Sequence, residues 1–347
     1  MSPDSALLVA AISIAIANGA NDNFKGVATL FGSGTTSYRR ALLWATITTS
    51  LGSLTALFLA GSLVARFSGR GLVPDAITGQ TSFLFAVAGG AAITVFFASC
   101  TGFPISTTHA LTGALVGAGL VAAPADFRFA ALGSGFIAPL LISPVVAAVI
   151  VGIIHRLFPV KKNICLCFAQ SAPMNVNFPI VAPVSECAVH GLAPKATTHG
   201  LIDSAHYLSA GAVSYARGVN DTPKMLALLL PVSALSGHSA TVLIGAAIAV
   251  GGLAGARRVA ETMSHRVTTM NPHQGLIANC ATALLVLTAS PFGLPVSTTH
   301  VSSGALFGLG AVTGQARTHA IVQIILSWVL TLPCAAAFAG LLICLAP

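Results

Sequence analysis

The chain has 347 residues, of which 55% are hydrophobic and only 7% are charged, whereas about a quarter of the residues in a soluble domain are charged. This composition excludes a water-soluble globular protein and indicates a chain that lies in a lipid bilayer. The formal net charge of +8 does not indicate nucleic-acid binding, because the basic residues fall in short breaks between apolar runs.

Residues 1–155 are rich in apolar stretches and are interpreted as the first transmembrane repeat. The stretches lie near 6–17, 24–32, 41–65, 82–99, 110–123 and 129–154. Those at 41–65 and 129–154 reach the roughly 20 residues that a spanning helix needs. The others are shorter or broken by glycine and proline, which is typical of discontinuous helices beside a binding site. Runs this apolar also exclude the alternating pattern of a membrane β-barrel.

Residues 156–200 lack a strong apolar run and contain five prolines, so we expect a central loop between two halves. Lys161 and Lys162 place this loop in the cytoplasm by the positive-inside rule. Cys165, Cys167 and Cys187 are interpreted as reduced thiols in this loop. A metal site that includes them is the alternative, although their spacing matches no common zinc pattern.

Residues 201–347 are interpreted as the second transmembrane repeat. Its apolar stretches lie near 201–216, 225–235, 240–256, 276–289, 301–313 and 320–345. The order of long and interrupted stretches resembles that of the first half. The fold class expected from these patterns is an all-α polytopic membrane protein.

Two motifs occur twice in the chain. Gly19-Ala20-Asn21-Asp22, followed by Lys25, returns as Gly218-Val219-Asn220-Asp221, followed by Lys224. Pro104-Ile105-Ser106-Thr107-Thr108-His109 returns as Pro295-Val296-Ser297-Thr298-Thr299-His300. The offsets are 199 residues (221 minus 22) and 191 residues (295 minus 104).

A single long period of this kind predicts two inverted-topology repeats, each of which supplies half of one central site. Inverted halves must each cross the membrane an odd number of times. We therefore expect a re-entrant hairpin in each half, with the Pro-x-Ser-Thr-Thr-His motif at its tip.

The serines and threonines of the second motif predict a place for an anion. Hydroxyl side chains at a helix start cap the helix, and free backbone N–H groups and the positive end of the helix dipole then face the gap. Two such starts, Ser106–Thr108 and Ser297–Thr299, can hold one tetrahedral oxyanion between them. The alternative is that these hydroxyls only cap their helices. The glycines that follow in each copy predict close helix packing: Gly113, Gly117, Gly119, Gly304, Gly308 and Gly310.

The first motif places carboxylates in apolar surroundings, where they are costly and normally paired or functional. Asp22 and Asp221 each have a lysine three residues further on, so a structural ion pair is the alternative to a functional role. Two aspartates and two lysines sum to zero, and an oxyanion such as phosphate then needs an accompanying cation. Asp22 and Asp221, together with Asn21 and Asn220, are the candidates to bind this coupling cation. If the cation is sodium, Asp22 and Asp221 are its expected metal ligands.

Four residues are candidates for tuning the charge of this site: Lys25, Lys224, His109 and His300. The histidines have either a structural role or, if the coupling uses H+, a role as proton carriers. Arg217 lies beside the second Asn-Asp motif and has no counterpart in the first half, where Asn18 stands.

The motifs resemble those of the inorganic phosphate transporter (PiT) family over residues 15–315. The resemblance implies inverted repeats, cation symport and a homodimer. By motif match it implies phosphate and cation sites lined by Asn21, Asp22, Ser106, Thr107, Thr108, Asn220, Asp221, Ser297, Thr298 and Thr299. Lys25 departs from the pattern, because sodium-coupled relatives often have a neutral residue there, and this leaves sodium and proton coupling both open.

We therefore expect a secondary transporter that imports inorganic phosphate together with Na+ or H+. It needs no other cofactor, has no nucleic-acid partner and lies in a bacterial inner (plasma) membrane. The alternatives are a transporter of another oxyanion such as sulfate, or a passive anion channel. An enzyme is not expected, because the chain has neither a His-Glu-x-x-His motif nor a Gly-x-Ser-x-Gly motif.

Overall fold

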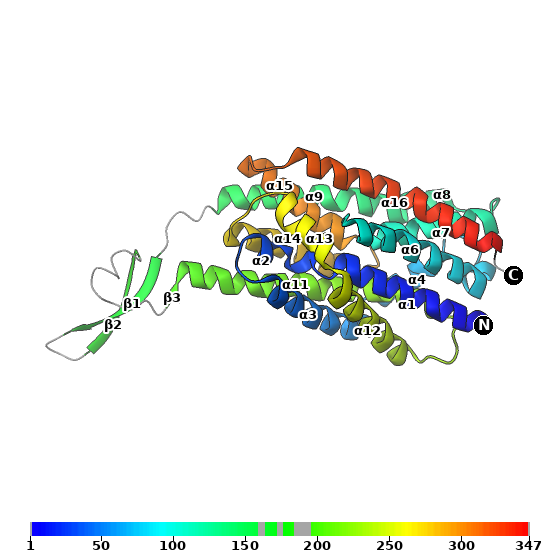
Figure 1. Ribbon diagram of the computed structural model, residues 1–347, viewed down its shortest axis with the longest axis horizontal. Coiled ribbons are helices and arrows are strands. Elements are labelled where there is room, and N and C mark those ends of the chain that lie inside the picture. Colours follow the sequence, from blue (N-terminus) through cyan, green and yellow to red (C-terminus); the bar gives the residue numbers. More distant parts are fainter. Residues whose placement is uncertain (1, 159–163, 172–175, 184–195, 346–347) are drawn as a thin grey trace.

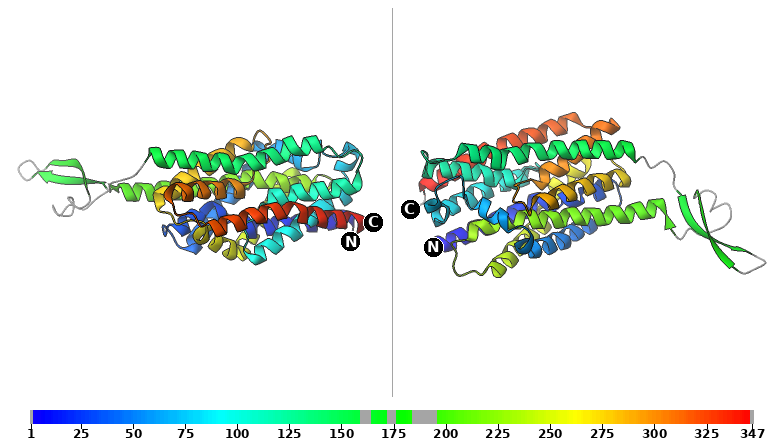
Figure 2. Two further views of the ribbon diagram at one scale, coloured as in Figure 1. Left: turned by 90° about the horizontal axis from the view of Figure 1, so that it is seen from above. Right: turned by 180° about the vertical axis from the view of Figure 1, so that it is seen from behind.

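The computed structural model describes residues 2–158, 164–171, 176–183 and 196–345, with backbone alone for 164–171, 176–183 and 196–199. The helices follow one long axis and form an elongated bundle (Figure 1). Helix α1 (Pro3–Asp22) begins and α16 (Thr318–Leu345) ends at the same end of the bundle. The strands lie beyond the other end, as two further views confirm (Figure 2).

The first half is helical, and its helices are separated by short breaks. After α1 it contains η1 (Lys25–Val27), α2 (Ala28–Gly32), α3 (Tyr38–Leu59), α4 (Gly61–Phe67), α5 (Asp75–Thr78), α6 (Thr81–Thr101), α7 (Thr107–Ala122), α8 (Phe129–Leu132), η2 (Gly133–Ile137) and α9 (Ala138–Leu157). The apolar stretch at 41–65 does not form one helix, because the backbone turns at Ala60 (φ −139°, ψ 33°) between α3 and α4.

The second half is also helical. It contains α11 (Thr198–Leu226), η3 (Ala227–Leu229), α12 (Gly237–Gly255), α13 (Arg257–Glu261), η4 (Thr262–Arg266), α14 (Pro272–Ala289), α15 (Thr298–Thr313) and α16. The short apolar stretch at 225–235 contributes the end of α11, η3 and a turn, and it makes no helix of its own.

The central segment, expected to be a loop, contains a small sheet in its described part. Strand β1 (Ile164–Ser171) pairs antiparallel with β2 (Val176–Pro183) and with β3 (Ala196–Thr197), in the order β2-β1-β3. Ile164, Leu166 and Phe168 alternate along β1, which is typical of a strand. The question of a metal site at Cys165, Cys167 and Cys187 falls outside the described side chains.

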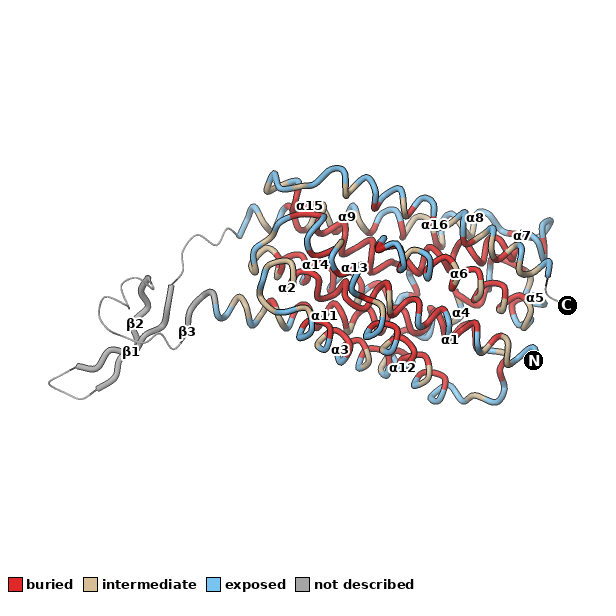
Figure 3. Tube along the Cα trace, in the orientation of Figure 1, coloured by how far each residue is buried: buried red, intermediate tan, exposed pale blue. Residues whose placement is uncertain are grey.

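Six helices in the described ranges are long and apolar enough to cross a membrane. They cover Pro3–Gly32, Tyr38–Leu59, Thr81–Thr101, Phe129–Leu157, Gly237–Gly255 and Thr318–Leu345. Large apolar side chains such as Phe58 (79% exposed) and Val329 (64% exposed) face outward, and exposed segments surround a buried centre (Figure 3). Lipid solvates such a surface and water does not, so the chain is an integral membrane protein.

Two helical hairpins place the second motif inside the bundle. Helices α6 and α7 form one hairpin, and α14 and α15 form the other. With 16 residues each, α7 and α15 are about 24 Å long and therefore too short to cross a hydrocarbon layer of about 30 Å. Ser106 accepts from His109 N at 3.0 Å and Ser297 from His300 N at 3.2 Å, which confirms the expected helix caps.

Each half packs one of its helices against a helix of the other half, and the two contacts match. Helix α3 of the first half packs on α11, and α12 of the second half packs on α1. A Cβ atom at Gly52 would lie 2.1 Å from the Tyr215 carbonyl oxygen, and one at Gly251 would lie 2.0 Å from that of Ile16. The two contacts are related by the repeat, since their members are displaced by 199 residues (251 minus 52 and 215 minus 16). Glycine is required at both crossings because any side chain would overlap the facing backbone.

Close packing also follows the hairpin helices, as the repeated glycines predict. A Cβ at Gly117 of α7 would lie 1.9 Å from the Ala336 carbonyl oxygen of α16, and one at Gly308 of α15 would lie 2.3 Å from that of Ala148 in α9. These contacts fix α7 and α15 against the last helix of the opposite half. The starts of both helices are thereby held in the centre of the bundle.

Candidate functional site

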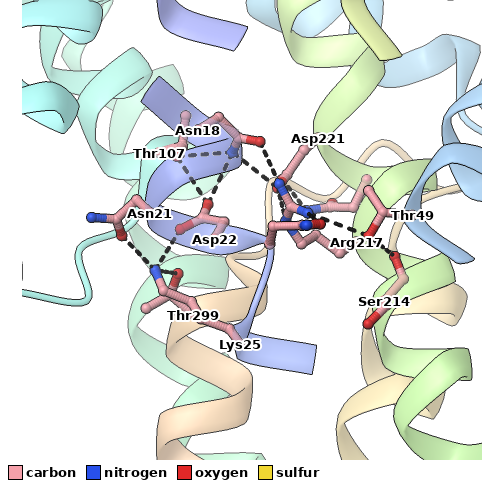
Figure 4. A network of polar contacts seen from close by, with 12 residues as sticks. Asn18, Asn21, Asp22, Lys25, Thr49, Thr107, Ser214, Arg217, Asp221 and Thr299 are labelled. Carbon is pink, nitrogen blue, oxygen red and sulfur yellow. Dashed lines mark hydrogen bonds and ion pairs between the residues drawn. The ribbon is translucent and has the colours of Figure 1, made fainter. Parts of the chain in front are cut away.

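The two Asn-Asp motifs and the two hairpin tips meet in one buried cluster. Figure 4 shows part of it, with Asp22, Asp221 and Thr299. Lys25, from the first half, binds both tips. Its Nζ donates to the Ile105 carbonyl oxygen at 2.6 Å and to Thr299 Oγ1 at 2.8 Å. It also donates to Asn21 Oδ1 at 2.8 Å and forms an ion pair with Asp22. The ion pair considered from the sequence is therefore present, and it is one part of a larger network.

Lys224 occupies the matching place in the second half. Its Nζ donates to Thr108 Oγ1 at 2.6 Å, to the Val296 carbonyl oxygen at 3.1 Å and to Asp221 Oδ1 at 3.2 Å. Each lysine thus contacts its own aspartate, one tip carbonyl and a threonine of the other half. Thr299 Oγ1 also donates to the Ile105 carbonyl oxygen at 3.0 Å, so the two tips touch directly.

The asparagines of the motif hold the tips through serines that the sequence analysis missed. Asn21 Nδ2 donates to Ser99 Oγ at 3.1 Å and to the Phe103 carbonyl oxygen at 3.0 Å. In the second half Ser290 Oγ donates to Asn220 Oδ1 at 3.3 Å. A signal for this pair exists, because Ser99 and Ser290 are separated by the same 191 residues (290 minus 99) as the second motif.

Asn18 joins the two aspartates across the interface of the halves. Its Nδ2 lies 2.9 Å from Asp22 Oδ2, 3.0 Å from Thr107 Oγ1 and 3.2 Å from Asp221 Oδ2. Thr107 Oγ1 itself donates to Asp22 Oδ2 at 2.9 Å. Both carboxylates therefore belong to one continuous network.

Arg217 breaks the symmetry of the cluster. It is 1% exposed, and its guanidinium donates to Asn18 Oδ1 at 2.7 Å and to Asn23 Oδ1 at 3.0 Å. Its Nε lies 3.6 Å from Asp221 Oδ2. The sequence comparison of the halves identified Arg217 as unmatched but gave it no role. With it, three positive charges face two negative ones, and the centre has a net charge of +1 instead of zero.

The remaining expected site residues, Ser106, Ser297 and Thr298, lie at the starts of α7 and α15, and the two serines have a structural role there. Ser106 and Ser297 use their hydroxyls as helix caps, as the alternative interpretation held. Thr298 is buried in the first turn of α15, 4% exposed. The backbone N–H groups of a helix's first turn have no intrahelical partner. The serine caps use only the N–H groups of His109 and His300.

The His109 and His300 rings, in the first turns of α7 and α15, meet edge to face. Their ring centroids lie 4.3 Å apart, and the Trp328 ring lies 3.9 Å from that of His300. His300 Nδ1 lies 3.2 Å from the Leu140 carbonyl oxygen. Within the described residues, His109 Nδ1 and His300 Nε2 have no hydrogen-bond partner. The two histidine rings and Trp328 therefore form an aromatic cluster at the starts of α7 and α15.

Groups of three or more His, Cys, Asp or Glu side chains that suit a metal ion are not found in the part of the chain whose side chains are described. Asp22 and Asp221 both accept a hydrogen bond from Asn18 Nδ2 and are each paired with a lysine. Any cation that binds here must therefore share the aspartates with the lysines.

A helical membrane fold and a buried ionic centre assembled from two matching halves define a polytopic membrane transporter. A family model for the phosphate transporter family matches residues 18–339. The chain belongs to the phosphate transporter family, which confirms the resemblance found in its motifs.

Relatives with similar sequences cover nearly the whole chain. A Rhizobium meliloti protein, "Probable low-affinity inorganic phosphate transporter", is 28% identical over 96% of this chain and 95% of its own length. "Inorganic phosphate transporter 2-1, chloroplastic" from Arabidopsis thaliana is 27% identical over 92% of this chain and 68% of its own. A solved structure, "The sodium-dependent phosphate transporter", has a TM-score of 0.80 at 22% identity and covers 99% of both chains. This last likeness shows that the fold is shared.

Proposed function

We propose that the chain is a secondary active transporter that imports inorganic phosphate by symport with Na+ or H+, through one central site shared by two inverted repeats. The observation that carries this proposal is the meeting of both motif pairs in one buried cluster. Helices α1 and α11 enter the bundle from opposite ends, which supports the inverted relation of residues 1–155 and 201–347 (Figure 1).

The anion site is proposed between the starts of α7 and α15. First-turn backbone N–H groups of both helices lie there. The threonine hydroxyls and the amides of Asn21 and Asn220 are engaged in hydrogen bonds within the protein, which phosphate would replace. The net charge of +1 attracts phosphate. Divalent phosphate and the centre together carry a net charge of −1, and one accompanying monovalent cation neutralises this charge. The electrostatics of the centre therefore favour symport.

The coupling cation is proposed to bind at Asp22 and Asp221, assisted by Asn21 and Asn220. The solved structure that shares this fold is that of a sodium-dependent phosphate transporter, which makes sodium one candidate, and the proton is the other. His109 and His300, which lie in the first turns of α7 and α15, are proposed to tune the charge of the site.

The closed arrangement of the centre favours a transporter over a passive channel. The Asn-Asp motifs and both tips are almost completely buried, so phosphate must displace existing contacts to enter. We further propose that the chain lies in a bacterial inner membrane as a homodimer, with residues 156–200 in the cytoplasm.

Counterflow of labelled phosphate into proteoliposomes tests this function. We expect internal unlabelled phosphate to drive accumulation of external label, and excess sulfate to compete poorly. Strong competition by sulfate would favour the other oxyanion. Equilibration without counterflow, with passive flux that survives Asp22→Asn and Asp221→Asn, would favour a channel.

A further inference from the structure

Each lysine of the centre lies in a shell of oxygen atoms drawn from both halves. Around Lys25 Nζ this shell consists of the Asp22 carboxylate, the Asn21 side-chain oxygen, the Ile105 carbonyl and the Thr299 hydroxyl. Carboxylate, carbonyl and hydroxyl oxygens are the hard ligands that alkali and alkaline-earth cations take in proteins. The shell thus has the ligands of a cation-binding site, and the cation that it holds is the ammonium group of Lys25.

The second half builds a matching shell around Lys224, without the asparagine oxygen. Its oxygens come from the Asp221 carboxylate, the Val296 carbonyl and the Thr108 hydroxyl. An ammonium group has three hydrogen-bond donors, and these three contacts use all of them. The arrangement therefore occurs twice, at positions that the repeat makes equivalent.

Neither ammonium group leaves room for a second cation. Lys25 is 4% exposed and Lys224 is 1% exposed, and the oxygens that they contact lie within 3.2 Å. A sodium ion bound to the same oxygens would meet the ammonium at hydrogen-bonding distance, in surroundings that screen charge poorly. The residues present therefore do not fit a sodium ion while the lysines hold their places.

We propose that Lys25 and Lys224 are tethered cations that occupy the oxygen shells a sodium-coupled transporter would offer to Na+, and that phosphate transport by this chain requires no sodium. This inference rests on the proposed function and narrows its coupling cation to the proton. A purely structural ion pair would need only the aspartate. The additional carbonyl and hydroxyl ligands of both lysines, and the amide oxygen beside Lys25, are what a shell built for a cation contains.

The first test compares wild-type proteoliposomes in sodium and in choline media at equal pH and membrane potential. A coupled ion normally changes a ligand's affinity by about 5–150-fold. We expect the initial rate of labelled phosphate uptake to differ by less than about twofold between the media. A sodium stimulation of about fivefold or more would overturn the proposal.

The second test opens the first shell. In Lys25→Ala the ammonium is gone and its four oxygens remain, so we expect uptake to fall in choline and to recover at least about fivefold in sodium. Sodium should also raise the melting temperature of Lys25→Ala, because an ion that binds only the folded state stabilises it. Lys25→Met is the matched control, since its uncharged side chain of similar length fills the shell. We expect no recovery with sodium in this variant.

The outcomes separate the two proposals. A folded Lys25→Ala protein in which sodium changes neither uptake nor melting temperature would overturn the idea of a cation shell. If Lys25→Ala does not fold, the wild-type comparison still decides the sodium requirement. Absence of phosphate counterflow by the wild type in both media would instead refute the proposed function itself.

Discussion

Replacing Arg217 by asparagine tests whether the unmatched arginine organises the centre. The substitution copies the residue of the first half, Asn18, into the second half. A side chain this short loses the guanidinium donors at 2.7 Å from Asn18 Oδ1 and 3.0 Å from Asn23 Oδ1, and the ion pair with Asp221 at 3.6 Å. It also lowers the net charge of the centre from +1 to zero.

The magnitude follows from the burial of these contacts. Breaking a buried charge pair costs about 3–5 kcal/mol, and hydrogen bonds to a charged group contribute about 1.5–3 kcal/mol each. Asp221 keeps Lys224 as a partner, so we expect a loss at the lower end, about 3 kcal/mol of unfolding free energy. Phosphate affinity should fall as well, on the order of tenfold for each 1.4 kcal/mol of lost attraction.

Equilibrium unfolding in detergent and binding of labelled phosphate measure the two effects. Arg257→Asn is the matched control, because Arg257 is exposed and pairs with Glu261 at 3.3 Å on the surface. Such a pair contributes at most about 1 kcal/mol. If Arg217→Asn were no less stable than Arg257→Asn and bound phosphate like the wild type, the proposed role of Arg217 would be wrong.

Three further predictions concern other parts of the site and fold. Ser106→Ala combined with Ser297→Ala should weaken phosphate binding more than either change alone, since each lost cap costs about 0.5–2 kcal/mol at one helix start; equal affinities in a binding assay would argue against a shared site. Gly52→Ala should destabilise the protein by about 1–3 kcal/mol or more, because its Cβ would lie 2.1 Å from the Tyr215 carbonyl oxygen, whereas Gly61→Ala, with no atom within 4 Å, should unfold like the wild type. Asp22→Asn should abolish gradient-driven phosphate uptake while the protein stays folded, and uptake at the wild-type rate would contradict a role for this carboxylate in coupling.

Much of the architecture was predictable because each motif, and the glycines that follow the second one, occur twice in the sequence. The Pro-x-Ser-Thr-Thr-His motif predicted a helix start after a break, and both copies have a capping serine at that place. The repeated glycines predicted close crossings, which Gly117 and Gly308 make. Local sequence is sufficient here, because caps and small-residue contacts depend on neighbouring positions.

The partners of the site residues were less predictable, because they depend on how the two halves dock. Nothing local indicates that Lys25 reaches Thr299, 274 residues away. The role of Arg217 was missed because a comparison of halves finds what they share, and Arg217 stands where they differ. The turn at Ala60 has only a weak local signal, Gly61 followed by Ser62, inside a stretch that is otherwise apolar.

The stoichiometry of phosphate binding tests most directly whether the two halves form one site. Equilibrium binding of labelled phosphate to the purified wild-type protein in detergent gives the number of ions bound per chain at saturation. We expect a single ion per chain, because both hairpin tips contribute to the same centre. Saturation at two ions per chain would show that each half binds phosphate by itself and would contradict a shared site.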